Sequence, residues 1–210
     1  MTSGLRRFLT AEDVGPQAPA VPCCEMCGEP LGSTHGHIVD IENRSILCGC
    51  RACYLLFTSD GSGGHRFAAI PERYRHDPHF AMDQSTWDSI GIPVRMAFFF
   101  HNSQLGTMAA FYPSPAGATE SLLPLEEWQQ VVADNPEFAE TAPDVEAMLV
   151  NRTDDGFECF GVPIDACYRL VGLVKLNWRG FDGGSEAWQR IDGFFDELRQ
   201  RSKTVGGHDG

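Results

Sequence analysis

Runs of apolar residues predict antiparallel strands in the middle and the second half of the chain. Residues 94–100 are nearly all apolar, which is typical of a strand buried on both faces of a sheet. Residues 107–112 follow after a short turn and complete a hairpin. Residues 145–151 fit a short helix or a strand. A turn at residues 154–156, before another apolar run, favours a second hairpin over residues 145–162.

Apolar residues at helical spacing predict helices between and after these strands. We expect helices over residues 83–90, before Asn135, over residues 164–175, and from Ser185 to about residue 203. Ser185 is the expected N-cap of the last helix. The apolar stripe of that helix consists of Trp188, Ile191, Phe194, Phe195 and Leu198.

Shorter segments carry weaker signals. Residues 54–58 and 66–70 read as strands, and residues 113–121 read as a loop of small residues. Residues 71–78 are polar and expected to be exposed, with His76 among them. His76, His65 and His79 are interpreted as solvated histidines rather than as a second metal or acid–base site, because no recognisable ligand spacing accompanies them.

Cysteines give the strongest chemical signal, because six of the eight lie between Cys23 and Cys53. Cys24-x-x-Cys27 and Cys50-x-x-Cys53 are separated by 22 residues, which is the spacing of a four-thiolate metal site. Residues 37–41 and 45–48 read as a hairpin with a turn over residues 42–44, in which Asn43 tolerates left-handed geometry. Such a hairpin would return the second cysteine pair to the first.

Several other side chains compete for the same site. Cys48 is the first substitute for one of the four predicted ligands, and Cys23 is adjacent to Cys24. His35 and His37 could each replace a sulfur, because imidazole is a good zinc ligand. Unligated, reduced core thiols are the alternative to a metal site. The two remaining cysteines lack a C-x-x-C partner and are expected to be small buried residues; they are Cys159 and Cys167.

Charge argues against a nucleic-acid partner. The formal net charge is −13, and the cysteine-rich stretch carries only Arg44 and Arg51 as basic residues. Nucleic-acid binding requires basic side chains that neutralise phosphates. The sequence therefore predicts a protein partner and no nucleic acid. It shows no sustained apolar stretch for a signal peptide or a membrane span, so we expect no membrane association and a reducing cytoplasm.

The fold class predicted from these patterns is α+β. A small N-terminal metal module, zinc-ribbon-like or rubredoxin-like, would precede a mainly antiparallel sheet packed with helices. The expected organisation is a flexible arm over residues 1–22, the four-cysteine module over residues 23–58, an α+β domain over residues 59–203 and a disordered tail over residues 204–210.

The sequence also resembles a family with no established activity. The segments that carry the resemblance are Cys24–Leu31, His35–His37, Cys48–Cys53, Ala97–Phe100, Tyr112–Ser121, Val162–Tyr168 and Trp178–Gly184. They are similar to an uncharacterised actinobacterial domain family whose members are typically encoded beside uptake nickel–iron hydrogenase genes. The resemblance implies a hydrogenase subunit or maturation factor as the partner.

Two functions follow from the sequence. The first is a non-catalytic accessory or assembly protein with a structural zinc held by Cys24, Cys27, Cys50 and Cys53. The second is a rubredoxin-like protein that passes electrons through iron in the same site, since tetrahedral sulfur suits either metal. The turn after Cys53 lacks the glycine that follows Cys27, which favours zinc. An enzyme is disfavoured and no catalytic residue is predicted, because a closed four-thiolate site leaves no position for a reactive water.

Overall fold

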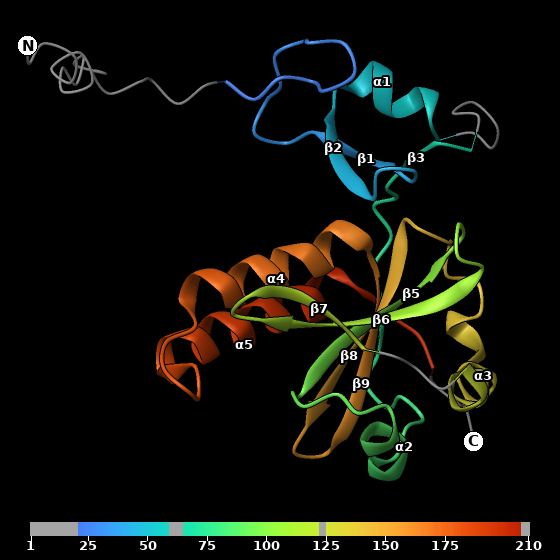
Figure 1. Cartoon of the computed structure of the whole chain (residues 1–210), viewed down its shortest axis with the longest axis vertical. Coiled ribbons are helices and arrows are strands. Elements are labelled where there is room, and N and C mark those ends of the chain that lie inside the picture. Colours follow the sequence, from blue (N-terminus) through green and yellow to red (C-terminus); the bar gives the residue numbers. More distant parts are fainter. Residues whose placement is uncertain (1–20, 59–64, 122–124, 207–210) are drawn as a thin grey trace, which may run out of the picture.

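The fold is α+β, with two sheets and helices on both faces of the larger one (Figure 1). A computed structural model of the chain describes residues 21–58, 65–121 and 125–206, with only the backbone of residues 125–127. Most of the predicted N-terminal arm, residues 1–20, and the last residues of the predicted tail, 207–210, lie outside the described residues.

The small sheet has three antiparallel strands in the order β2-β1-β3. They are β1 (Gly36–Asp40), β2 (Ser45–Gly49) and β3 (Phe67–Ala69), and the helix α1 (Arg51–Leu56) follows β2. The predicted hairpin and the strand around residues 66–70 are therefore confirmed. β3 pairs with β1, so this sheet includes residues beyond 58.

The large sheet has seven strands in the order β10-β4-β9-β8-β5-β6-β7. All neighbours are antiparallel except β10 and β4. The strands are β4 (Arg75–Asp77), β5 (Met96–Asn102), β6 (Thr107–Ser114), β7 (Gly117–Ser121), β8 (Glu146–Thr153), β9 (Gly156–Pro163) and β10 (Lys203–Thr204). Both predicted hairpins are present, as β5–β6 and β8–β9.

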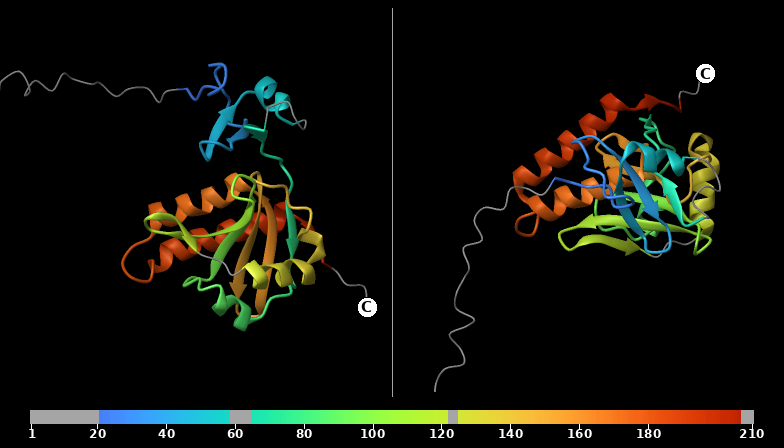
Figure 2. Two further views of the ribbon diagram at one scale, coloured as in Figure 1. Left: turned by 45° about the vertical axis from the view of Figure 1, so that its right-hand side comes forward. Right: turned by 90° about the horizontal axis from the view of Figure 1, so that it is seen from above.

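Helices cover the two faces of this sheet, as the two views of Figure 2 also show. One face is covered by α4 (Ile164–Asn177) and α5 (Gly184–Arg201). The opposite face carries α2 (Gln84–Ser89), α3 (Leu125–Asp134) and the short 3-10 helix η2 (Pro136–Phe138). No helix in the described part of the chain combines the length and apolarity that crossing a bilayer requires.

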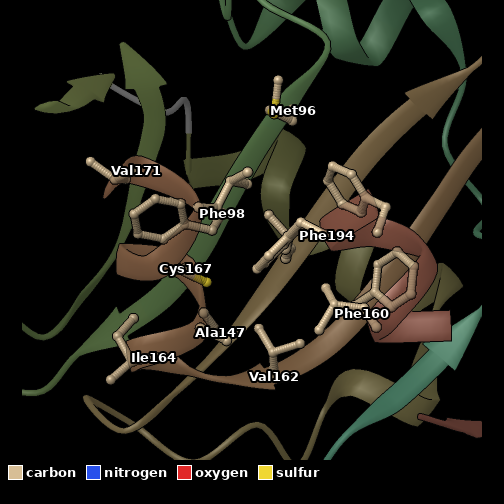
Figure 3. Packing of buried hydrophobic residues seen from close by; sticks show 14 of the residues in the cluster. Met96, Phe98, Ala147, Phe160, Val162, Ile164, Cys167, Val171 and Phe194 are labelled. Carbon is tan, nitrogen blue, oxygen red and sulfur yellow. The ribbon is translucent and has the colours of Figure 1, made fainter. Parts of the chain in front are cut away.

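Alternating side chains on β5 explain why its sequence is almost wholly apolar. Phe98 packs on the α4–α5 side with Phe160 and Phe194 (Figure 3). Phe99 points to the other side, where its ring stacks on Trp128 at a centroid distance of 4.0 Å. A strand with helices on both faces needs apolar residues at every position, because neither face meets water.

Four local predictions were wrong. Residues 54–58 are not a strand; residues 54–56 complete α1. Residues 113–121 form the β6–β7 hairpin rather than a loop. Gly183, in left-handed geometry at φ 86°, takes the N-cap position expected of Ser185. Residue 204 belongs to β10, and the backbone N–H of Val205 donates to the carbonyl of His76, so the tail is ordered at its start.

The segment 71–78 was expected to be exposed, but it supplies β4. His76 is buried and stacks on Phe160 at 4.3 Å between ring centroids. Its Nε2 lies 3.0 Å from a carboxylate oxygen of Glu158, which also accepts hydrogen bonds from Arg199 and Asn151. Polar residues are buried here because their partners come from β8, β9 and α5, which local composition does not reveal.

Candidate metal centre

The β1–β2 hairpin brings the two C-x-x-C pairs to one end of the small sheet. Its register pairs Gly36 with Gly49 at that end and Asp40 with Ser45 at the turn. The turn differs in detail from the prediction. Arg44, not Asn43, has the left-handed conformation, with φ 52°. Asn43 instead donates from its backbone N–H and its side-chain amide to the Asp40 carboxylate, at 3.1 and 2.8 Å.

A tight turn positions the first cysteine pair. The backbone N–H of Gly28 donates to the carbonyl of Cys24 at 2.8 Å, which closes the turn around Cys27. Gly28 has φ 80° and an added Cβ would meet nothing within 4 Å, so glycine is required here for its backbone conformation and not for space. The Cys24 N–H donates in turn to the carbonyl of Glu29 at 2.8 Å.

A helix start positions the second pair. Cys50 is the N-cap of α1, and its sulfur accepts from the backbone N–H of Cys53 at 3.5 Å. The Tyr54 N–H donates to the Cys50 carbonyl at 2.9 Å. The two pairs are therefore held differently, the first by a glycine turn and the second by a helix N-terminus.

The structure brings the four predicted sulfur atoms into one group. The Sγ atoms of Cys24, Cys27, Cys50 and Cys53 all lie within 4.8 Å of one another. The Sγ atoms of Cys27 and Cys50 are 3.7 Å apart. A tetrahedral ion with metal–sulfur bonds of about 2.3 Å requires sulfur–sulfur distances of about 3.8 Å. The four sulfurs could therefore hold one metal ion with little rearrangement.

The electrostatics of the four thiols are unequal. Burial alone would raise the pKa of Cys24, but backbone N–H groups of Cys50, Met26 and Cys27 lower this pKa to about 6. Burial and hydrogen bonding with the other three sulfurs raise the pKa of Cys53 to about 12. One thiolate thus forms readily and disfavours ionisation of its neighbours. A divalent cation would remove this conflict, because it binds and stabilises thiolates.

The site lies at the surface of the small module, with one side buried. Cys24 and Cys50 are buried with Leu31, and Cys27 is exposed. This exposure argues against the alternative of four unligated core thiols. Cys159 and Cys167, in contrast, are completely buried in the large domain, as predicted, and burial raises the pKa of each thiol well above its usual range.

The four alternative ligands lie outside this sulfur group. Cys23 is exposed, and its sulfur donates to the carbonyl of Val21 at 3.4 Å. The other three form a group of their own: one donor atom each from His35, His37 and Cys48 lies within 4.8 Å of the others. Sequence reasoning named these residues as substitutes in one site and missed that they gather separately.

A contact between the small module and the large domain was also missed. His37 Nδ1 lies 2.6 Å from a carboxylate oxygen of Asp165. The hydrogen bond to the Asp165 carboxylate raises the pKa of His37 above its usual value, and the negative charge of Asp165 adds to this effect. Burial opposes both by lowering the pKa. Asp165 lies in the first turn of α4, and the predicted helix start was the only sequence signal that marked it.

Comparison with known proteins identifies a family and no activity. A family of unknown function, DUF5947, matches residues 23–202, and the chain belongs to this family. No curated protein and no solved structure matches the chain. The family match carries no information about hydrogenase genes. The function therefore has to be argued from the residues of the site.

Proposed function

We propose that this member of DUF5947 is a non-catalytic accessory or assembly protein in which Cys24, Cys27, Cys50 and Cys53 hold a structural zinc. The observation that carries the proposal is the convergence of these four sulfurs, with 3.7 Å between Cys27 and Cys50. Four protein ligands close the coordination sphere of zinc, so such a site stabilises a fold and offers no position for a reacting water.

The small module is then a zinc-ribbon-like unit. Its support is the β1–β2 hairpin, which carries one cysteine pair before β1 and the other after β2. The large domain has its own core of apolar residues from β5, β8, β9, α4 and α5. Metal loss is expected to affect the module first.

Electron transfer through iron is the second candidate. Exposure of Cys27 favours it, because an ion bound there would lie close to the surface and to a redox partner. The unequal turns favour zinc instead, since only the first pair is followed by a left-handed glycine. Elemental analysis and an absorption spectrum of the purified chain distinguish them. Zinc and no visible band support the first function; thiolate-to-iron absorption that a reductant bleaches supports the second.

A protein partner fits the surface next to the site. Leu55 and Leu56 on α1 are 48% and 60% exposed, and α1 has no buried residue among those described. Adjacent exposed leucines suit an apolar contact with a polar rim. The net charge of −13 disfavours nucleic acid and anionic membranes. The resemblance in sequence supplies the candidate partner, a hydrogenase subunit or maturation factor, in a reducing cytoplasm.

Co-purification of the tagged chain from its native host tests the partner. Recovery of a hydrogenase subunit or maturation factor, reduced by Leu55→Ser with Leu56→Ser, would support the proposal. Leu105→Ser is the matched control, because Leu105 is 53% exposed in the β5–β6 turn of the large domain. Recovery of nucleic acid at moderate salt, with no hydrogenase-related protein, would refute the accessory function.

A further inference from the structure

The second cluster of metal-ligand side chains lies on one face of the β1–β2 hairpin. His37 and Cys48 are paired across β1 and β2, so their side chains leave the sheet on the same side. His35 precedes His37 by two residues and shares that side. The two imidazole rings meet edge to face, with 5.1 Å between centroids, and all three donor atoms fall within 4.8 Å of one another.

Hydrogen bonds at Nδ1 of both imidazoles fix the position of one ring proton in each. Nδ1 of His35 lies 3.0 Å from the carbonyl oxygen of Gly32, and Nδ1 of His37 lies 2.6 Å from the Asp165 carboxylate. Both partners are acceptors, so each Nδ1 carries a proton, and the lone pair of the neutral ring lies on Nε2, where it can bind a metal ion. Histidines that bind zinc show the same pattern: one ring nitrogen binds the metal and the other donates to a carbonyl or a carboxylate.

An orphaned nitrogen supports the same conclusion. His35 Nε2 is buried and has no hydrogen-bond partner within the part of the chain that the structure describes. Buried polar atoms are normally satisfied, and an unsatisfied one needs an explanation such as a bound ion. A metal ion coordinated by this lone pair supplies the missing partner.

We propose that His35, His37 and Cys48 form a second metal site, distinct from the four-cysteine site and suited to zinc. Imidazole and thiolate are preferred zinc ligands, and two histidines with one cysteine provide three of the four positions. This inference goes beyond the proposed function, because it stands on different side chains and on a different coordination type.

A cavity between the small module and the large domain lies beside this site. The cavity has a volume of about 750 Å³, and both histidines line it together with Tyr54, Asp165 and Arg169. Three protein ligands beside an accessible cavity leave room for water or a small anion on the metal. The second site is therefore open, whereas the four-cysteine site is closed.

Asp165 acts as a positioning residue for this metal. It belongs to α4 of the large domain, while the three ligands belong to the small module. Its hydrogen bond orients the His37 ring only while the two parts are in contact. Loss of such an outer carboxylate typically weakens metal binding about 10–100-fold.

Zinc stoichiometry of the full chain tests the second site. The reduced, metal-free chain and its variants are dialysed against Zn²⁺ and analysed for bound metal. The parent should bind two equivalents, and His35→Gln and Cys48→Ala should each bind one. His79→Gln is the matched control, because His79 is exposed and lies away from the cluster, and it should bind two.

Cobalt substitution shows which site is lost and whether the variants remain folded. Intensity of thiolate-to-Co²⁺ charge transfer follows the number of bound thiolates, so the four-cysteine site dominates the spectrum. His35→Gln should keep that intense band and lose one equivalent of cobalt. Asp165→Asn should keep both equivalents at saturation but bind the second about 10–100-fold more weakly.

The two proposals fail in different ways. Unchanged zinc stoichiometry in both His35→Gln and Cys48→Ala overturns the second site, even if Cys27→Ser removes an equivalent. Unchanged stoichiometry in Cys27→Ser overturns the four-cysteine site, even if His35→Gln removes an equivalent.

Discussion

Removal of the metal from the four-cysteine site should unfold one short segment and spare the rest of the protein. The segment runs from Pro22 to Leu31, where the Leu31 N–H donates to the Pro22 carbonyl at 2.7 Å. It contains no regular helix or strand, and Leu31 is its only buried aliphatic side chain. The perturbation is Cys27→Ser, or a chelator applied to the parent chain.

The magnitude follows from the contacts of this segment. Ordering about ten residues costs about 15 kcal/mol at about 1.5 kcal/mol each. Four backbone hydrogen bonds contribute about 4 kcal/mol of stabilisation; their donors are Cys24, Glu25, Gly28 and Leu31. Burial of the Leu31 side chain contributes about 2 kcal/mol more. The deficit is about 9 kcal/mol, and zinc binding to four thiolates supplies about 10–16 kcal/mol. The segment should therefore be ordered only with its metal.

Amide hydrogen exchange read by mass spectrometry measures this directly. Peptides covering residues 22–31 should be protected in the parent and exchange at nearly the rate of an unfolded chain after metal removal. Peptides from β8 and β9 should stay protected, because they form the centre of the large sheet. Protection of residues 22–31 that survives verified metal removal would refute the reasoning. Cys23→Ser is the control, since its exposed sulfur lies outside the group.

Three further predictions concern the large domain and the surface. Burial alone would raise the pKa of Glu158, but hydrogen bonds from His76, Arg199 and Asn151 lower this pKa to about 2. Because this value lies below that of the unfolded chain, the contribution of Glu158 is present above about pH 4.3 and is lost as the pH falls towards 2. Glu158→Gln should lower the free energy of unfolding by about 2 kcal/mol at pH 7 and remove the loss of stability at low pH that Glu158 causes. Denaturant titrations at several pH values measure both effects. A variant that loses stability in acid as the parent does would contradict this. Phe98→Ala should cost about 3–5 kcal/mol in the same assay and leave the metal content of the folded protein unchanged, because Phe98 is fully buried in the core of the large domain and the four predicted metal ligands lie in the small module. Retention on a DNA column should be absent at low salt, where repulsion between the acidic chain and phosphates is strongest, and binding there would count against the charge argument.

The parts of the fold that could be predicted are those set by neighbouring residues. Two-sided burial of β5 is visible in its continuous apolar run, and the α5 stripe is visible in its helical spacing. The cysteine pairs are visible because each C-x-x-C turn is local and their sulfurs need only a hairpin to meet.

Other features depend on contacts that local residue patterns do not reveal. The segment 71–78 looked exposed, yet β4 pairs with β9 and buries His76 against Phe160. Residues 54–58 looked like a strand, yet the Cys50 sulfur caps a helix instead. Long-range pairing overrides local preference in the segment 71–78, whereas a local helix cap decides the segment 54–58.

The cluster of His35, His37 and Cys48 could not be predicted because it depends on the register of the β1–β2 hairpin. A turn limited to residues 42–44 would pair His37 with Gly49, which has no side chain to act as a ligand. The observed loop covers residues 41–44 and pairs His37 with Cys48. A shift of one residue changes the partner of every position on the strand, so the cluster cannot be read without the register.

Metal content of two neighbouring cysteine variants tests the central claim most directly. The full chain is purified as the parent, as Cys27→Ser and as Cys23→Ser, and bound zinc and iron are measured per chain. The four-cysteine site predicts that Cys27→Ser loses one equivalent of metal and that Cys23→Ser keeps the parent content, since only Cys27 lies in the sulfur group. Parent-like metal in Cys27→Ser, or equal losses in both variants, would contradict it.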